Sequence, residues 1–253
     1  SMLRLAWLAA LALVGYSGLV EPRLLTVREH RLHLQTPAKL PPLRLALVAD
    51  VHAGLFVRGW QIERLVDRLN ALDVDAVVVA GDWTYDPPRD LHALLQPFSR
   101  LRHPVWGVLG NHDAEQDIPR AGIGRIVTSY AGTLNTLNAD GELADVVLEI
   151  AGKKSPAALL YCLDSHDYST VEGIDGYGWF TQDQIRWYRD RSAAYTGANG
   201  GKPLPALAFF HIALPEYVAA WRNPDNTHIG RAAEDECPGE LNPGMFAAMV
   251  ESG

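Results

Sequence analysis

Three short and almost uninterrupted apolar segments most constrain the fold of this chain. They alternate with two segments in which apolar residues recur at the spacing of a helix that packs on one side. Alternation of buried strands with such helices predicts a parallel sheet joined by right-handed crossovers. The predicted strands are residues 43–49, 76–80 and 105–109, and the predicted helices are 61–72 and 91–101, the second interrupted by Pro97.

The second half of the chain is less regular but carries further apolar segments. Thr181, followed by Gln184, forms the capping pattern of a helix start. We expect strands at 146–150, 157–163 and 206–210, a helix at 181–195, and a loop at 223–244, where Pro, Gly and Asn are frequent.

Residues 1–20 form a separate, strongly apolar segment. No charged residue occurs in 5–20. This stretch is slightly shorter than the roughly 20 residues that cross a bilayer, so it suits a signal peptide or a short membrane anchor. A buried core helix is the alternative. The absence of an A-x-A cleavage pattern favours an uncleaved anchor, followed by a linker at 21–42 and a main domain at 43–253.

Charge and cysteine content argue against several classes of protein. The 253 residues include 22 Lys+Arg and 30 Asp+Glu, and the net charge of −8 argues against general nucleic-acid binding through phosphate neutralisation. The two cysteines, Cys162 and Cys237, form no C-x-x-C pair, which excludes a disulfide scaffold and a cysteine-rich zinc module. A single disulfide in an oxidising compartment stays open.

Four of the predicted strands end in side chains that bind metal ions well. Taken singly, a Gly-Asp pair after a strand is usually a turn and a lone histidine is more often a hydrogen-bonded core or loop residue, whereas Gly-Asn-His-Asp is more specific. Because the carboxyl ends of strands line the ligand crevice of a parallel sheet, we expect these groups to converge. Carboxylate, amide and imidazole donors without thiolates suit Mn, Fe or Zn. The strand-end groups are Asp50 and His52, Asp82, Asn111 and His112, and His211.

Taken together, these motifs resemble those of the calcineurin-like metallophosphoesterases, which include purple acid phosphatases. The motifs are Asp50-x-His52, Gly81-Asp82, Gly110-Asn111-His112-Asp113 and the strand-end His211. The resemblance covers roughly residues 43–253. It implies an α/β fold of the four-layer α+β type, in which helices flank a two-sheet β-sandwich. It also implies two divalent or trivalent metal ions at the edge of the sandwich.

The resemblance further implies a role for each strand-end residue. Asp50 and His52 would hold the first metal ion, Asp82 would bridge both, and Asn111 and His211 would hold the second. His112 would act beside the substrate phosphate as an acid or charge stabiliser. A metal-activated water would then hydrolyse a small phosphoester, and monoester and diester substrates both stay open.

Two branches of the family contribute to the resemblance. Residues up to about Asp113, with the apolar N-terminus, are similar to bacterial membrane-anchored members, which implies a membrane-associated or exported protein. The stretch from Asp164-Ser165-His166 to His211 is similar to the purple-acid-phosphatase-like branch. That Asp-Ser-His segment, which follows a predicted strand, either borders the site or makes structural hydrogen bonds.

One motif of the family is absent from this sequence. The family ends its metal site with a Gly-His-x-His turn after a further strand, and that strand would begin at about residues 247–253. We therefore expect a sheet without its C-terminal strands and one imidazole fewer for each metal ion. The alternative function is that of a truncated, non-catalytic relative that binds metal or phosphate weakly or serves as an interaction domain.

Overall fold

The computed structural model describes residues 2–16, 20, 24–33, 42–115, 118–152, 155–228 and 235–252. The chain divides into two compact units, Ser1–His33 and Leu34–Gly253. The first unit contains helix α1 (Met2–Gly15). Within the described parts of the chain, no helix combines the length and the apolar character that crossing a membrane requires. The predicted linker at 21–42 lies partly outside the described residues.

The first sheet of the second unit is parallel, as predicted. Its strands are β1 (Leu45–Val48), β3 (Ala76–Ala80) and β5 (Val105–Val108), in the order β1-β3-β5. All five residues of β3 are buried, because this central strand is covered on both faces. β1 is different: among the described residues it pairs with β3 alone, and its Leu47 is 61% exposed. The buried strand expected at 43–49 is therefore an edge strand.

The second sheet combines β6 (Val146–Ala151), β7 (Pro156–Cys162) and β8 (Ala206–Phe209). β6 and β7 are antiparallel, whereas β7 and β8 are parallel. Side chains from the facing sides of the two sheets form one apolar cluster between them, with Val78 and Trp106 from the first sheet and Leu160 and Cys162 from the second. The two-sheet sandwich that the sequence predicted is thus confirmed.

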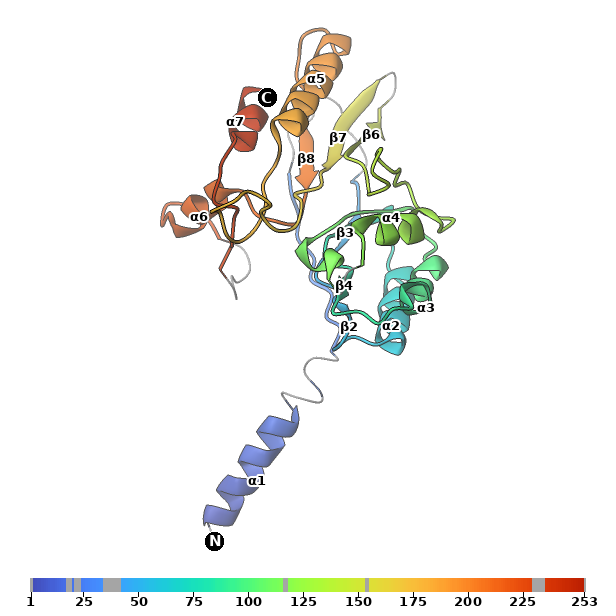
Figure 1. The fold of residues 1–253 in the computed structure, drawn as a ribbon, viewed down its shortest axis with the longest axis vertical. Coiled ribbons are helices and arrows are strands. Elements are labelled where there is room, and N and C mark those ends of the chain that lie inside the picture. Colours follow the sequence, from blue (N-terminus) through green and yellow to red (C-terminus); the bar gives the residue numbers. More distant parts are fainter. Residues whose placement is uncertain are drawn as a thin grey trace. The chain divides into compact units, whose positions relative to one another are not determined.

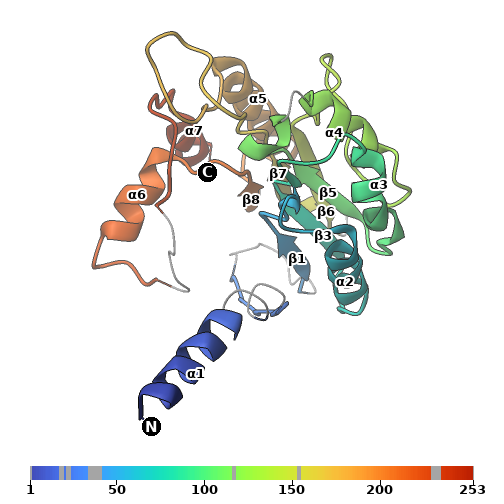
Figure 2. The ribbon, with the colours of Figure 1, turned by 60° about the horizontal axis from the view of Figure 1, so that its bottom comes forward.

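Helices cover both outer faces of the sandwich (Figures 1 and 2). The alternate residues of β3 and β7 point outward and pack against these helices. The first sheet is covered by α2 (Gly59–Asn70), α3 (Leu91–Leu95), the 3-10 helix η3 (Gln96–Arg100) and α4 (Arg120–Thr128), and the second by α5 (Gln182–Ala198) and α7 (Met245–Glu251). The fold is the predicted four-layer arrangement.

The interruption that Pro97 predicts in the helix at 91–101 is confirmed: the segment is split into α3 and η3, since Pro97 lies at the start of η3 and cannot donate a helical hydrogen bond. Other local elements differ from the sequence-based expectation. Residues 247–252, where the resemblance places the start of a last strand, lie in and just after α7. Helices α4 and α6 (Pro215–Arg222) were not expected at all. The predicted loop at 223–244 contains no helix or strand in its described parts, 223–228 and 235–244.

Candidate metal centre

All six strand-end residues that the sequence singled out come together at one edge of the sandwich. Asp50 and His52 follow β1, Asp82 follows β3, and His211 follows β8. Asn111 and His112 lie in the short 3-10 helix η4 (Asn111–Ala114), which follows β5. A small parallel pair, β2 (Ala53–Gly54) and β4 (Thr84–Tyr85), joins two of these loops next to the site.

Asp82 lies at the centre of this cluster. Its carboxylate Oδ2 is 3.0 Å from His52 Nε2 and 3.2 Å from His211 Nε2. Its other oxygen, Oδ1, accepts a hydrogen bond from the backbone N–H of His112 at 3.0 Å. The side chain of Asp82 is only 2% exposed. A buried carboxylate requires such partners, because desolvating an unpaired charge is very costly.

The Asp82 carboxylate and the two histidines beside it shift one another's pKa values. Burial alone would lower the pKa of His211, but the hydrogen bond and charge of Asp82, together with the Ala80 carbonyl, raise it to about 9. The hydrogen bond to Asp82 also raises the pKa of His52. Burial would raise the pKa of Asp82, yet its contacts with His211 and His52 hold it well below the usual range. In the metal-free protein, positive charge therefore gathers around a carboxylate that stays ionised.

Two groups of potential metal ligands overlap at this carboxylate. In one group, ligand atoms of His52, Asp82 and His112 lie within 4.8 Å of one another, and in the other those of Asp50, Asp82 and His211 do. Asn111 adds an amide oxygen, Oδ1, 3.1 Å from His211 Nε2. The resemblance implied that Asp82 bridges two ions, and Asp82 is the residue that the two groups share. The resemblance paired Asp50 with His52, whereas the distances group Asp50 with His211. His52 Nε2 nevertheless lies 3.9 Å from Asp50 Oδ1.

The backbone at the strand ends is bent into unusual conformations. Asp50, His52 and Asp82 have positive φ angles of 53°, 50° and 52°. L-residues adopt this left-handed region at a cost of about 1–3 kcal/mol each, and such residues cluster at functional sites. The turns bring His52 Nε2 within 3.0 Å of the Asp82 carboxylate and 3.9 Å of the Asp50 carboxylate.

Two glycines make the close approach of the loops possible. A Cβ atom at Gly81, whose φ is 87°, would lie 2.5 Å from the ring of His211. A Cβ atom at Gly110 would overlap the Asp82 carboxylate and lie 2.8 Å from His211 Cδ2. The Gly-Asp and Gly-Asn-His-Asp motifs therefore need glycine because three loops meet there with no room for a side chain.

Buried side chains next to the site hold the loops after β3 and β5 in place. Trp83 Nε1 donates to the carbonyl of Val108 at 3.0 Å, which ties the loop after β3 to β5. Asp113, 1% exposed, accepts hydrogen bonds from the backbone N–H groups of Thr84 and Gly110, both at 2.9 Å. Burial raises the pKa of Asp113 to about 6, although these two bonds oppose the rise. Asp113 thus holds η4 against the Asp82 loop and does not point at the ligand cluster.

His112 has a partner that the sequence reasoning missed. Its Nδ1 lies 2.6 Å from Glu115 Oε1, and Glu115 Oε2 accepts from the backbone N–H of Asp86 at 2.6 Å. With Nδ1 taken up by this carboxylate, the opposite ring nitrogen, Nε2, is left for other contacts. Glu115 follows His112 by three positions, which one turn of 3-10 helix brings onto the same side.

The Asp164-Ser165-His166 segment makes structural hydrogen bonds. Asp164 pairs with Arg120, and Ser165 Oγ accepts from the backbone of Ile212 at 2.8 Å. His166 Nε2 lies 2.8 Å from Gln184 Oε1. Of the two interpretations of this segment, structural support is the one that the contacts favour. Tyr168, just beyond it, was also missed: its hydroxyl accepts from Asn111 Nδ2 at 3.3 Å.

The donor set fits hard or borderline metal ions. It consists of carboxylate, amide and imidazole groups, and the one cysteine of the sandwich core, Cys162, belongs to the apolar cluster between the sheets. The strained turns, and the close packing of the loops at Gly81 and Gly110, hold these donors in place in the metal-free protein. The residues therefore form a preorganised site around a carboxylate able to bridge two ions.

Comparison with known proteins agrees with this geometry. Among curated proteins, a probable inactive purple acid phosphatase 29 from Arabidopsis thaliana is 28% identical over 203 residues, 71% of this chain and 51% of that protein. The phosphatase DCR2 of Saccharomyces cerevisiae is 31% identical over 158 residues, 58% of this chain and 24% of that protein. The chain thus spans about half the length of the plant relative it matches, and less of the yeast one.

The fold also has a solved counterpart. A dimetal phosphatase from Danio rerio aligns with a TM-score of 0.52, covering 83% of this chain and 76% of that structure at 12% identity. The sequence model of the family described as Calcineurin-like phosphoesterase matches residues 43–237, which is most of the chain and includes every strand-end residue of the site. This protein is a member of the calcineurin-like phosphoesterase family.

Proposed function

We propose that this chain hydrolyses small phosphoesters at a dinuclear metal centre built on Asp82. The observation that supports this most is the sharing of one buried carboxylate by two ligand groups. The imidazoles of His52 and His211 both lie within 3.2 Å of the Asp82 carboxylate, and each belongs to a different one of these groups. Membership of the family supports metal-dependent phosphoester hydrolysis in general terms.

In this proposal each ion has its own set of ligands. Asp50 and His52 would hold one ion, Asn111 and His211 would hold the other, and the Asp82 carboxylate would serve both. When bound, two such ions supply Lewis acidity and a lowered pKa for an attacking water. The chain's own contribution is to hold five donors on four loops, so that little rearrangement accompanies binding. Mn, Fe and Zn all suit these donors.

His112 is the proposed acid for the leaving group. Glu115 Oε1, 2.6 Å from Nδ1, fixes the orientation of the ring and leaves Nε2 on its opposite side. The Nε2 proton is then available to the oxygen that departs from phosphorus. The backbone N–H of His112, bound to Asp82 Oδ1, keeps this residue beside the bridging carboxylate.

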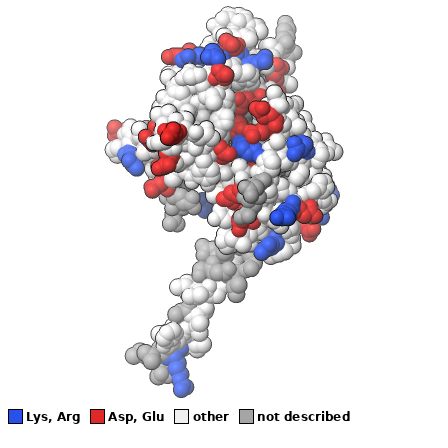
Figure 3. Space-filling model, viewed as in Figure 1, with Lys and Arg blue, Asp and Glu red and all other residues white. Residues whose placement is uncertain are grey.

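The charge distribution supports a small substrate over a nucleic acid. The chain carries a net charge of −8. On the face drawn in Figure 3, most Lys and Arg side chains lie beside Asp or Glu, in agreement with ion pairs such as Arg189–Glu251 and Arg100–Asp67. No basic stripe suited to a phosphate backbone stands out on that face. Attachment to a membrane through residues 1–20 is a separate proposal.

A non-catalytic role is the second candidate. Three of the curated relatives are named probable inactive purple acid phosphatases. A chain of this kind would bind metal or phosphate weakly without turnover.

Metal analysis and turnover on the same preparation separate the two candidates. We expect two Mn, Fe or Zn ions per chain and hydrolysis of 4-nitrophenyl phosphate or bis(4-nitrophenyl) phosphate that a chelator abolishes. Asp82→Asn should lose both metal and activity because the bridge loses its charge. Retention of near-wild-type activity by Asp82→Asn would contradict the site, and absence of both metal and turnover in the wild type would favour the second candidate.

A further inference from the structure

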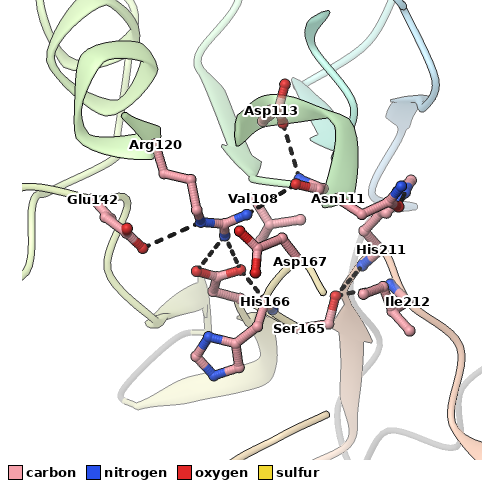
Figure 4. Close-up of polar contacts among 12 residues, drawn as sticks. Val108, Asn111, Asp113, Arg120, Glu142, Ser165, His166, Asp167, His211 and Ile212 are labelled. Atoms are coloured by element: carbon pink, nitrogen blue, oxygen red, sulfur yellow. Dashed lines mark hydrogen bonds and ion pairs between the residues drawn. The ribbon is translucent and has the colours of Figure 1, made fainter. Parts of the chain in front are cut away.

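A buried arginine lies behind the proposed metal centre. Arg120, the first residue of α4, is 7% exposed, and its guanidinium reaches toward Glu142 and the strand-end segment that contains Ser165 and His166 (Figure 4). Nη2 donates to both oxygens of Asp164, at 2.6 and 2.7 Å, and Nε donates to Glu142 at 3.3 Å. The sequence reasoning assigned this arginine no role.

One arm of the guanidinium reaches the loop that carries Asn111. Arg120 Nη1 donates to the backbone carbonyl of Gly110 at 2.9 Å. Gly110 is the residue directly before Asn111, at the point where β5 turns into η4. This hydrogen bond restrains the backbone from which the Asn111 amide is presented to His211.

The other arm is connected to the loop that carries His211 through two intermediate residues. Asp164, held by Arg120, is followed by Ser165, which is 1% exposed. The hydroxyl oxygen of Ser165 accepts from the backbone N–H groups of His211 at 3.3 Å and Ile212 at 2.8 Å. Arg120 is therefore connected, through Asp164 and Ser165, to the backbone of the second proposed ligand.

The two connected residues face each other across the site. Asn111 Oδ1 and His211 Nε2 are 3.1 Å apart, although they come from different sheets of the sandwich. The planar guanidinium donates in fixed directions to a carbonyl and a carboxylate at once, which a lysine ammonium does not reproduce with the same geometry. Breaking a buried ion pair of this kind is costly, so the arrangement resists displacement.

We propose that Arg120 is a positioning residue that sets the spacing of Asn111 and His211, and thereby the affinity for the second metal ion. This inference rests on the proposed dinuclear site. It gives Arg120 and Ser165 a function beyond structural support, namely to position the side chains of Asn111 and His211. The hydrogen bonds of Arg120 lead to the loops that carry Asn111 and His211, whereas Asp50 and His52 lie on the loop after β1. Binding of the first ion should therefore be insensitive to Arg120.

Titration with Mn²⁺ of the metal-depleted wild type and of Arg120→Lys tests this. We expect the wild type to bind two ions and to show the electron paramagnetic resonance signal of a spin-coupled pair. Arg120→Lys should bind one ion as the wild type does and the other about 10–100-fold more weakly, the range for partners that orient metal ligands. The coupled signal should then be replaced by that of isolated Mn²⁺.

Two further variants make the result decisive. Arg189→Lys changes an exposed arginine paired with Glu251 and should leave both affinities unchanged. Ser165→Ala, which removes one hydroxyl without a change of charge, should weaken the same single ion and serves if Arg120→Lys does not fold. Wild-type affinity for both ions in Arg120→Lys, or in Ser165→Ala when only that variant folds, would overturn the inference. A wild type that binds no Mn²⁺ would instead overturn the proposed function and the inference with it.

Discussion

Single residues at this site combine conformational strain with strong electrostatic coupling. Asp82 adopts a positive φ of 52° and is almost fully buried, yet its carboxylate stays ionised because His52 and His211 lie beside it. The same histidines are the proposed metal ligands, so a proton and a metal ion compete for their ring nitrogens. His112 differs from them in having its own acidic partner, Glu115.

Replacement of His112 tests the proposed leaving-group acid. His112→Ala should lower kcat by about 10²–10⁴-fold, the usual contribution of a positioned acid, because the proton donor is lost. Metal content should stay near the wild-type value, since the proposed ligands remain. Steady-state kinetics with metal analysis measures both quantities, and His92→Ala, an exposed residue of α3, is the matched control. Loss of metal in His112→Ala would make His112 a ligand instead.

The pH dependence of stability tests the coupling of His211 and Asp82. The folded-state pKa of His211 is raised from 6.5 to about 9, so the ion pair contributes stability fully below pH 6.5 and loses it as pH rises through 9. Chelator-treated protein should therefore have a lower Tm at pH 9.5 than at pH 6.5. His211→Asn should show a smaller decrease, and an equal decrease in both proteins would contradict the coupling.

At the scale of elements, the site depends on how closely the strand-end loops approach one another. The loops after β3, β5 and β8 meet at Gly81 and Gly110, where a side chain would collide with His211 or Asp82. Trp83 and Asp113 hold these loops from the buried side. The elements thus act together: displacement of η4 changes the surroundings of ligands on two other strands.

Introduction of one methyl group tests this close packing. Gly110→Ala should reduce metal binding strongly, because its Cβ would collide with the Asp82 carboxylate and force η4 away. Gly122→Ala, in α4, has its nearest atom at 3.8 Å and should keep full metal content, with a gain in helix stability of up to about 1 kcal/mol. Metal analysis of both variants measures the difference. Equal metal content in the two variants would contradict the steric argument.

At the scale of the whole second unit, two sheets that each carry ligands are held together by one apolar layer. Leu160 lies in that layer and is 2% exposed, whereas Leu47 on β1 is 61% exposed. Asp82 and Asn111 come from the first sheet and His211 from the second. The packing between the sheets therefore fixes the distances within the site as well as the stability of the fold.

A matched pair of leucine variants tests the importance of this layer. Leu160→Ala should lower the free energy of unfolding by about 2–5 kcal/mol, because it leaves a cavity between the sheets. Leu47→Ala should change it by no more than about 0.5 kcal/mol. Urea unfolding of the metal-depleted proteins measures both values. A loss for Leu47→Ala as large as that for Leu160→Ala would show that β1 is covered in solution.

The buried strands could be predicted from the sequence for a physical reason, whereas the two-sheet sandwich was implied by the resemblance to the family. β3 and β7 are apolar on both faces because each is covered on both, and such runs are recognisable without knowledge of their neighbours. Arg120 and Asp164 could not be predicted as a pair, since 44 positions separate them and nothing local marks either one. Helix α4 was missed because Gly122 and Gly124 lower its helix propensity.

The exposed strand β1 has a consequence for handling this protein. An edge with free amide and carbonyl groups is a template onto which an extended segment of another molecule can add. The exposed side chain of Leu47 adds apolar surface to that edge, while the charged pair Arg44 and Asp73 flanks only its start. Since β1 pairs with β3 alone among the described residues, we expect concentrated solutions to self-associate through β1 and Leu47→Lys to reduce that association.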